Sequence, residues 1–379
     1  MAAEGVTPPG GGAGETARHL SACFHALREL VHGSCRWLAL EPRLDVKYAL
    51  ADQIHDDARS ARAVSRRLHE LRPPLDASRP GPALAALLDS LSSAGSADAY
   101  LRIAYGELKP RLAATVEQRV AATDPWRDEP SLRALLELRH RQRYHLADLP
   151  ATGARAAAAG APLEAEPTGG RARRLRPQPP IEAPARDGYV AVVSAAASIP
   201  SGARLIQALG RTAASAAAPT GGPASSLLHA LMHERVCWAE VATRTSHEHP
   251  ELPGAFHLDM AKLAWDASRH AQALERLLGR FGAGHWGQDP VSLAEFRSLY
   301  RPQLDERLAR MRDAARERLE RRPGIWSAAG AAPAAGDELR ETVDLLLADD
   351  QDHFECLADW GKRLGGAGAP GPEAPHSSS

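Results

Sequence analysis

The sequence predicts an all-α protein made of two tandem four-helix bundles. Long stretches carry apolar residues at i, i+3, i+4 and i+7 with charged residues between them, which is the pattern of amphipathic helices. Only one short run, YVAVV at 189–193, is typical of a strand, and one short strand does not form a sheet. The two halves of the chain also resemble each other, which predicts a repeated bundle.

The N-terminal half contains four predicted helices with turn residues between them. Pro42 lies in the first turn, and Pro73 and Pro74 cannot continue a helix, while Gly95 is expected to break the third helix. The expected ranges are 16–40, 44–71, 82–122 and 129–148.

The C-terminal half shows the same pattern of short and long connections. Its turns are HEHPELPG at 247–254 and the longer loop RRPGIWSAAGAAPAAG at 321–336. The expected helices span 225–247, 254–281, 291–321 and 337–363.

Composition sets the expected domain bounds. Bundles are predicted over 16–150 and 225–364, joined by a largely irregular Pro/Ala/Gly-rich linker over 151–224, with Gly/Pro/Ser-rich disordered tails at 1–15 and 365–379. The basic run RARRLRP inside this linker has two interpretations, a contact with an anionic partner or a solvated segment, and we favour the solvated segment.

The overall charge excludes some classes of partner. Lys and Arg total 46 against 47 for Asp and Glu, so nothing favours nucleic acid or an anionic membrane.

The chain has no apolar run long enough for a membrane helix and no secretory signal at its start. The four cysteines are far apart, as in proteins of a reducing compartment. We therefore expect a cytoplasmic protein with no nucleic-acid or membrane partner; the oligomeric state is left open.

The repeat can be read residue by residue. Residues 47–68 match 257–278 with Asp56 at the position of Asp266, and residues 128–145 match 336–353 with His145 at the position of His353. A third match, between 105–113 and 300–309, needs one gap. One duplication explains all three matches.

Carboxylate and histidine pairs in the C-terminal half predict a metal site. Asp350 and His353 are three residues apart, and Asp266 and His270 are four apart, so each pair shares a helix face. In an antiparallel hairpin of 225–247 and 254–281, His229 falls opposite His270. His233 and Glu234 fall opposite Asp266. Mixed carboxylate and imidazole ligands suit iron. The expected ligands are His229, His233, Glu234, Asp266, His270, Asp350 and His353. The alternative is that these groups face solvent or form structural hydrogen bonds.

The N-terminal half retains fewer such residues. Asp56 and Asp57 remain, with Glu29 at a similar height on the neighbouring helix. However, Ser60 stands at the position of His270, and Gln142 stands at the position of Asp350 in the repeat. We expect this half to serve as a scaffold.

Several motifs resemble the ferritin-like superfamily. These are WDASRHA at 265–271, TDPWRDEPSLRALL at 123–136 and LLLADDQDHFECLADW at 345–360. The similarity is to a bacterial branch distantly similar to the di-iron tRNA hydroxylase type, in which the second helix reads like Trp-Asp-Glu-Ala-Arg-His and the fourth like Asp-Glu-x-x-His. The resemblance covers 16–148 and 225–363 and implies ferritin-like bundles with iron as the cofactor.

The chain departs from that motif in ways that affect the expected function. Ala267 replaces the Glu of the second helix, while Glu234 or Glu240, and Glu317, are candidates for the carboxylates of the first and third helices. One hypothesis is an atypical iron-dependent oxidoreductase or oxygenase acting on a small metabolite. A second is a metal-free scaffold that binds a protein partner or ligand. A third is a hydrolase or isomerase that uses Asp/His pairs as acid and base. No residue is assigned a catalytic role.

Overall fold

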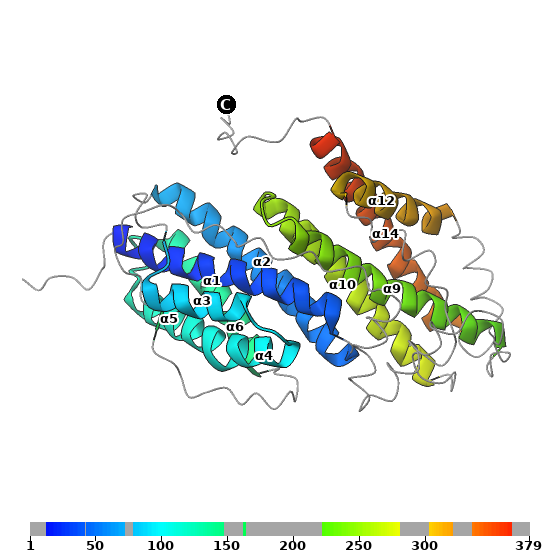
Figure 1. Cartoon of the computed structure of the whole chain (residues 1–379), viewed down its shortest axis with the longest axis horizontal. Coiled ribbons are helices and arrows are strands. Elements are labelled where there is room, and N and C mark those ends of the chain that lie inside the picture. Colours follow the sequence, from blue (N-terminus) through cyan, green and yellow to red (C-terminus); the bar gives the residue numbers. More distant parts are fainter. Residues whose placement is uncertain are drawn as a thin grey trace, which may run out of the picture. The chain divides into compact units, whose positions relative to one another are not determined.

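The computed structural model of the chain describes residues 13–41, 43–72, 79–147, 162–163, 222–280, 303–320 and 336–365. All regular elements in these ranges are helices and none is a strand (Figure 1). The all-α prediction is confirmed for this part of the chain. Some predicted segments lie outside the described residues. They are the strand-like run at 189–193, most of the linker at 151–224 and the tail at 365–379 beyond its first residue.

The chain divides into two compact units, and neither is a continuous stretch of sequence. Unit 1 comprises Met1–Glu41, Ala49–Pro180 and Ser246–Ala261, and unit 2 comprises Pro42–Tyr48, Ile181–Thr245 and Lys262–Ser379. Each unit therefore includes a short segment from the other half of the sequence. The composition-based domain bounds stay a prediction.

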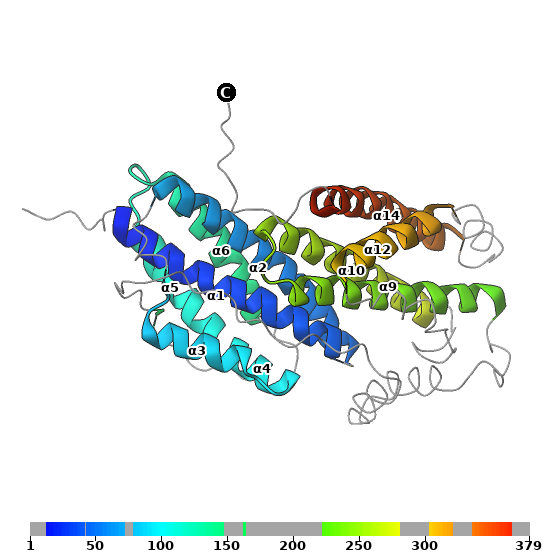
Figure 2. The same ribbon diagram turned by 45° about the horizontal axis from the view of Figure 1, so that its top comes forward.

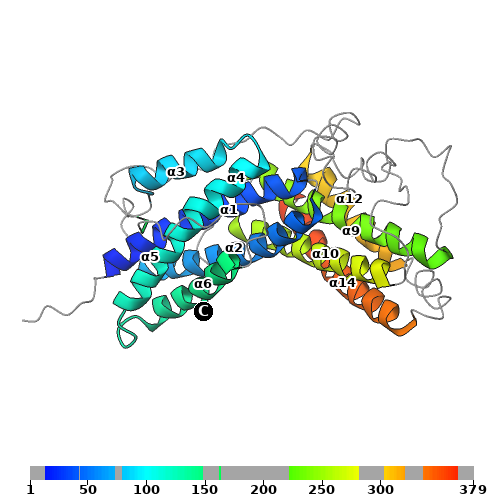
Figure 3. The same cartoon turned by 90° about the horizontal axis from the view of Figure 1, so that it is seen from below.

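Unit 1 is built mainly from the helices of the N-terminal half (Figure 3). They are α1 (Ala13–Leu40), α2 (Leu44–Leu71), α3 (Pro82–Ser92), α4 (Ala97–Ile103), the π-helical turn η2 (Ala104–Leu108), α5 (Lys109–Ala122) and α6 (Glu129–Ala147). The expected break near Gly95 is present, since α3 ends before it and α4 begins after it. Ser96 caps α4 by accepting a hydrogen bond from the Ala99 amide at 3.1 Å.

The contact of α4 with α1 depends on a glycine. A Cβ atom added at Gly33 would lie 2.5 Å from Cε2 of the Tyr100 ring. The Tyr100 hydroxyl lies 2.7 Å from Ser34 Oγ and donates to the Leu30 carbonyl at 3.0 Å. Because Gly33 has no side chain, the buried tyrosine can pack closely against α1, where its hydroxyl finds hydrogen-bond partners.

Unit 2 contains most of the helices from the C-terminal half (Figure 2). They are α9 (Gly222–Glu248), α10 (Gly254–Arg280), α12 (Leu304–Glu320) and α14 (Gly336–Gly365). Three of them begin and end within three residues of the predicted bounds. The predicted helix 291–321 is described only from 303, and α12 accounts for that part. None of the described helices is long and apolar enough to cross a membrane.

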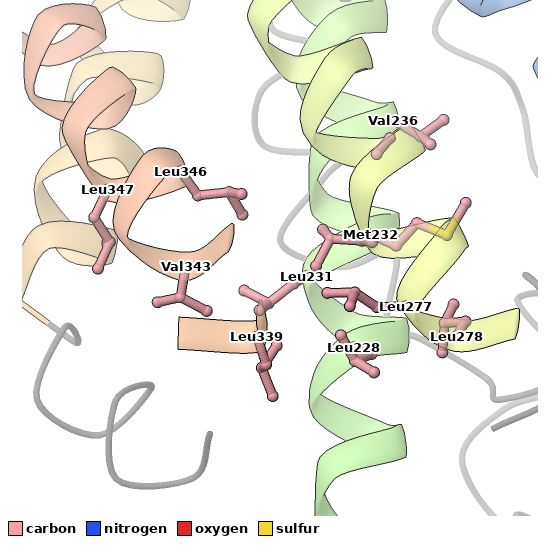
Figure 4. Packing of buried hydrophobic residues seen from close by; sticks show 12 residues of the cluster. Leu228, Leu231, Met232, Val236, Leu277, Leu278, Leu339, Val343, Leu346 and Leu347 are labelled. Carbon is pink, nitrogen blue, oxygen red and sulfur yellow. The ribbon is translucent and has the colours of Figure 1, made fainter. Parts of the chain in front are cut away.

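The apolar core of unit 2 joins three helices at one end of the unit (Figure 4). Leucines from α9, α10 and α14 dominate it, and each fully buried leucine contributes about 1.5–3 kcal/mol relative to exposure. The cluster is Leu228, Leu231, Met232, Val236, Ala271, Leu274, Leu277, Leu278, Leu339, Val343, Leu346 and Leu347.

Elsewhere in unit 2, charged side chains are buried between the helices. Arg235 on α9, Arg307 on α12 and Asp350 on α14 are all at most 1% exposed. Charged residues are rarely so buried unless they are paired. The partners of these charged groups decide whether the interior of unit 2 can bind a metal ion or another ligand.

Candidate functional site: buried ionic networks

Asp350 is the centre of an ionic network in unit 2. Arg235 Nη1 and Nη2 donate to the two Asp350 oxygens, each at 2.7 Å. Arg318 Nε donates to Oδ1 of the same carboxylate at 3.1 Å. This carboxylate therefore has two guanidinium partners, one of them bidentate, which is the strongest geometry for such a pair.

Three helices meet at this carboxylate. Asp350 lies on α14, Arg235 on α9 and Arg318 on α12. Arg318 also donates to Glu234 Oε1 at 3.0 Å and stacks over the Trp238 ring, with 4.1 Å from Cζ to the ring centroid. Burial alone would raise the pKa of Asp350, but the two arginines outweigh burial and hold that pKa well below its ordinary value. Asp350 is therefore ionised at neutral pH.

Asp266 and His353 form a second buried pair. The His353 Nε2–H donates to Asp266 Oδ2 at 3.1 Å, and both side chains are 1% exposed. Lys262 Nζ and Arg269 Nη2 also donate to Asp266, at 2.7 and 2.8 Å. Burial works to raise the pKa of Asp266, but the hydrogen bonds from His353 and Lys262 lower it below the ordinary value.

His270 has a different carboxylate partner, which the sequence analysis did not include. Its Nε2–H donates to Asp349 Oδ2 at 2.7 Å. Burial lowers the pKa of His270 although Asp349 acts in the opposite direction, so the ring is neutral at pH 7. Arg269 Nη2 lies 3.5 Å from Asp349 and 2.8 Å from Asp266, and so links the two Asp/His pairs.

The predicted ligands on α9 have other partners than expected. The hairpin geometry placed His233 and Glu234 opposite Asp266. Glu234 instead pairs with Arg318, and His233 Nε2 lies 3.5 Å from Cys237 Sγ one turn along α9. Burial lowers the pKa of His233 to about 4. His229 is also buried, at 3% exposure, on the same helix.

Unit 1 contains a buried network of its own, with lysine as the cation. Lys109 Nζ donates to Asp57 Oδ2 at 2.8 Å and to His145 Nδ1 at 3.1 Å. Gln142 Nε2 donates to Asp57 Oδ1 at 2.8 Å, and the His145 Nε2–H donates to Asp56 Oδ2 at 3.3 Å. Burial, followed by the charge of Lys109, lowers the pKa of His145.

These donor sets do not fit an iron ion as they stand. Iron bound by carboxylates needs their negative charge, but Asp350 is neutralised by two arginines and Asp57 by Lys109. Within the described ranges, no group of three or more His, Cys, Asp or Glu side chains is arranged to hold a metal ion. The iron ligands named from the sequence thus remain a prediction.

The three cations were not found by the sequence analysis, although a signal for two of them exists. On α9 the buried positions Leu228, Leu231, Met232 and Ala239 form one stripe, and Arg235 lies within it. Lys109 lies in the same way between the buried Tyr105, Leu112 and Val116. A basic residue within an apolar stripe requires a buried acidic partner.

Comparisons of the chain with family models, with curated proteins and with solved structures give no match. The ferritin-like resemblance therefore depends on the sequence motifs alone.

Proposed function

We propose that this chain is a metal-free protein of two ferritin-like bundles that acts by binding a ligand or partner, with internal ion pairs in place of an iron site. The observation that carries this proposal is the bidentate Arg235–Asp350 pair with Arg318 on the same carboxylate. A carboxylate buried between helices needs positive charge, which either a metal ion or a guanidinium can supply. In unit 2 two arginines supply it, and in unit 1 Lys109 does so for Asp57.

Equivalent positions in the two halves make equivalent contacts, which supports a duplication. Asp56 accepts from His145 at 3.3 Å, and Asp266 accepts from His353 at 3.1 Å. These pairs occupy matching positions of the repeated sequence.

A second position pair behaves in the same way. Ser60 and Arg141 are in contact at 3.0 Å, and their counterparts His270 and Asp349 are in contact at 2.7 Å. The residue types differ, but the pairs join corresponding helices, α2 with α6 in one half and α10 with α14 in the other. We infer that both copies kept the contact positions and changed the chemistry at them.

Metal analysis tests the proposal directly. Protein purified from iron-supplemented cells should contain less than about 0.1 iron per chain, because the carboxylates already have cationic partners. His270→Ala and His353→Ala should not change that content. Stoichiometric iron that both substitutions remove would overturn the metal-free assignment.

An iron-dependent oxidoreductase is the second candidate, and one observation favours it. The Nδ1 atoms of His270 and His353 are buried and have no hydrogen-bond partner among the described residues. Two partly exposed cations, Lys262 and Arg269, cover the carboxylates beside them, with side chains 43% and 38% exposed. Under this hypothesis Arg269→Ala should raise the iron content of the purified protein. An unchanged, near-zero content in this variant would count against it.

A further inference from the structure

The helices α2 and α6 of unit 1, together with Leu258 of α10, line an open, arginine-rich cavity, here called the arginine cavity. Its volume is about 580 Å³, within the range of about 300–1,000 Å³ common for small-molecule sites. It is lined by Arg59, Arg62, Ala63, Arg66, Arg67, Glu70, Glu129, Pro130, Arg133, Ala134, Glu137, Arg141 and Leu258. Six arginines outnumber three glutamates in this lining, so the cavity carries an excess of positive charge.

The antiparallel pairing of α2 and α6 fixes the walls of this cavity. Arg67 Nε donates to Ser131 Oγ at 2.8 Å near one end, and Arg141 Nη1 donates to Ser60 Oγ at 3.0 Å near the other. Arg67 also pairs with Asp128 at 2.7 Å. These half-buried arginines hold the two helices together, so their role in the cavity is structural.

Two arginines on α2 remain available to a ligand. Arg59 and Arg62 are exposed, and neither has a hydrogen-bond or ion-pair partner among the residues that the structure describes. Arg66 follows one turn later with a side chain 84% exposed, and its contact with Glu70 is 3.4 Å long. At spacings of three and four residues, the three guanidinium groups share one helix face and extend over about 10 Å.

An arginine on the opposite wall can also leave its ion pair and bind a ligand. Arg133 on α6 pairs with Glu129 at 2.7 Å, but both side chains are more than half exposed. Exposed ion pairs of this kind contribute about 0–1 kcal/mol, so an anionic ligand can take the place of Glu129 at little cost.

We propose that the arginine cavity binds a compact, linear polyanion, namely a small molecule carrying a chain of phosphoryl groups. Guanidinium forks match phosphate oxygens in bidentate geometry, and the row of arginines on α2 suits a linear array of charges. The chain as a whole has a net charge of −1, so the excess of arginine in the cavity is not the consequence of an overall basic protein. This inference rests on the proposed function, because it names the class of ligand for the proposed binding role. Anion binding is measured independently of iron content, so the two proposals can fail separately.

Calorimetric titration of the full-length chain with tripolyphosphate at about 0.1 M salt tests the proposal. The key variant is the double substitution Arg59→Gln/Arg62→Gln, which removes two cations that have no partner among the described residues. The matched control is Arg102→Gln/Arg127→Gln, which removes the same charge from exposed positions of unit 1 outside the cavity. We expect at least about tenfold weaker binding in the cavity variant and less than about twofold in the control.

Several results would overturn the assignment. One is the absence of binding by the wild-type chain at about 1 mM tripolyphosphate. Equal weakening in both double variants would indicate general charge attraction. Tighter binding of citrate would contradict a linear phosphate ligand, and tighter binding of a single-stranded oligonucleotide or of anionic vesicles would indicate a macromolecular surface instead. Circular dichroism of each variant confirms that the helices are retained.

Discussion

Replacing Asp350 with asparagine is the most direct perturbation of the unit 2 network. The amide has nearly the same shape but no charge, so it leaves Arg235 and Arg318 buried at 1% and 4% exposure without their shared counter-ion. Removing one partner of a buried ion pair costs about 3–5 kcal/mol, because the remaining charge stays desolvated. Glu234 still neutralises part of Arg318, while both Arg235 hydrogen bonds to a carboxylate are lost.

Denaturant unfolding followed by circular dichroism measures this loss. In a thermal melt, each kcal/mol of lost stability lowers the Tm of a unit of this size by about 2–4 °C. The same substitution should therefore lower Tm by about 6–20 °C. Asp352→Asn is the matched control, since Asp352 lies on the same helix and is exposed, and it should change stability by less than about 0.5 kcal/mol. A loss below about 1 kcal/mol for Asp350→Asn would refute the reasoning, because Asp350 could not then be the buried counter-ion of two arginines.

Three further predictions concern unit 1. Lys109→Met should lower the free energy of unfolding by about 3–5 kcal/mol because it leaves Asp57 buried without a cation, and adding Asp57→Asn should recover part of that loss in a double-mutant cycle. Gly33→Ala should cost about 1–3 kcal/mol in chemical unfolding, because its Cβ would overlap the Tyr100 ring; a neutral effect would contradict this close packing. Burial lowers the pKa of His247 to about 4, so the unfolded chain binds the proton first as pH falls from about 6.5 to 4, and stability should fall over that window. His247→Gln should remove about 3 kcal/mol of this pH dependence, measured as the difference in unfolding free energy between pH 7 and pH 4.

Local signals determined how well the helices could be predicted. The helix predicted over 44–71 has the same bounds in the structure, and the predicted break falls at Gly95, because periodicity and turn residues act within a few positions. The partners of the buried charges depend on helix rotation, which those signals do not contain. An antiparallel hairpin predicts the height of His233 and Glu234 relative to Asp266. Successive residues on a helix point about 100° apart, so equal height does not decide which side chains are in contact.

The Asp350 network also explains how unit 2 can maintain one arrangement of its helices. A well-packed apolar substitute for a buried ion pair is often as stable or more stable, so stability alone does not require these arginines. Apolar contacts such as those of the leucine cluster tolerate small rotations and shifts, whereas Asp350 accepts from α9 and α12 at once, at 2.7–3.1 Å. All three of these hydrogen bonds form only when α9, α12 and α14 hold one rotation and one height. We infer that the network specifies the packing of the bundle by fixing the rotation and height of these three helices.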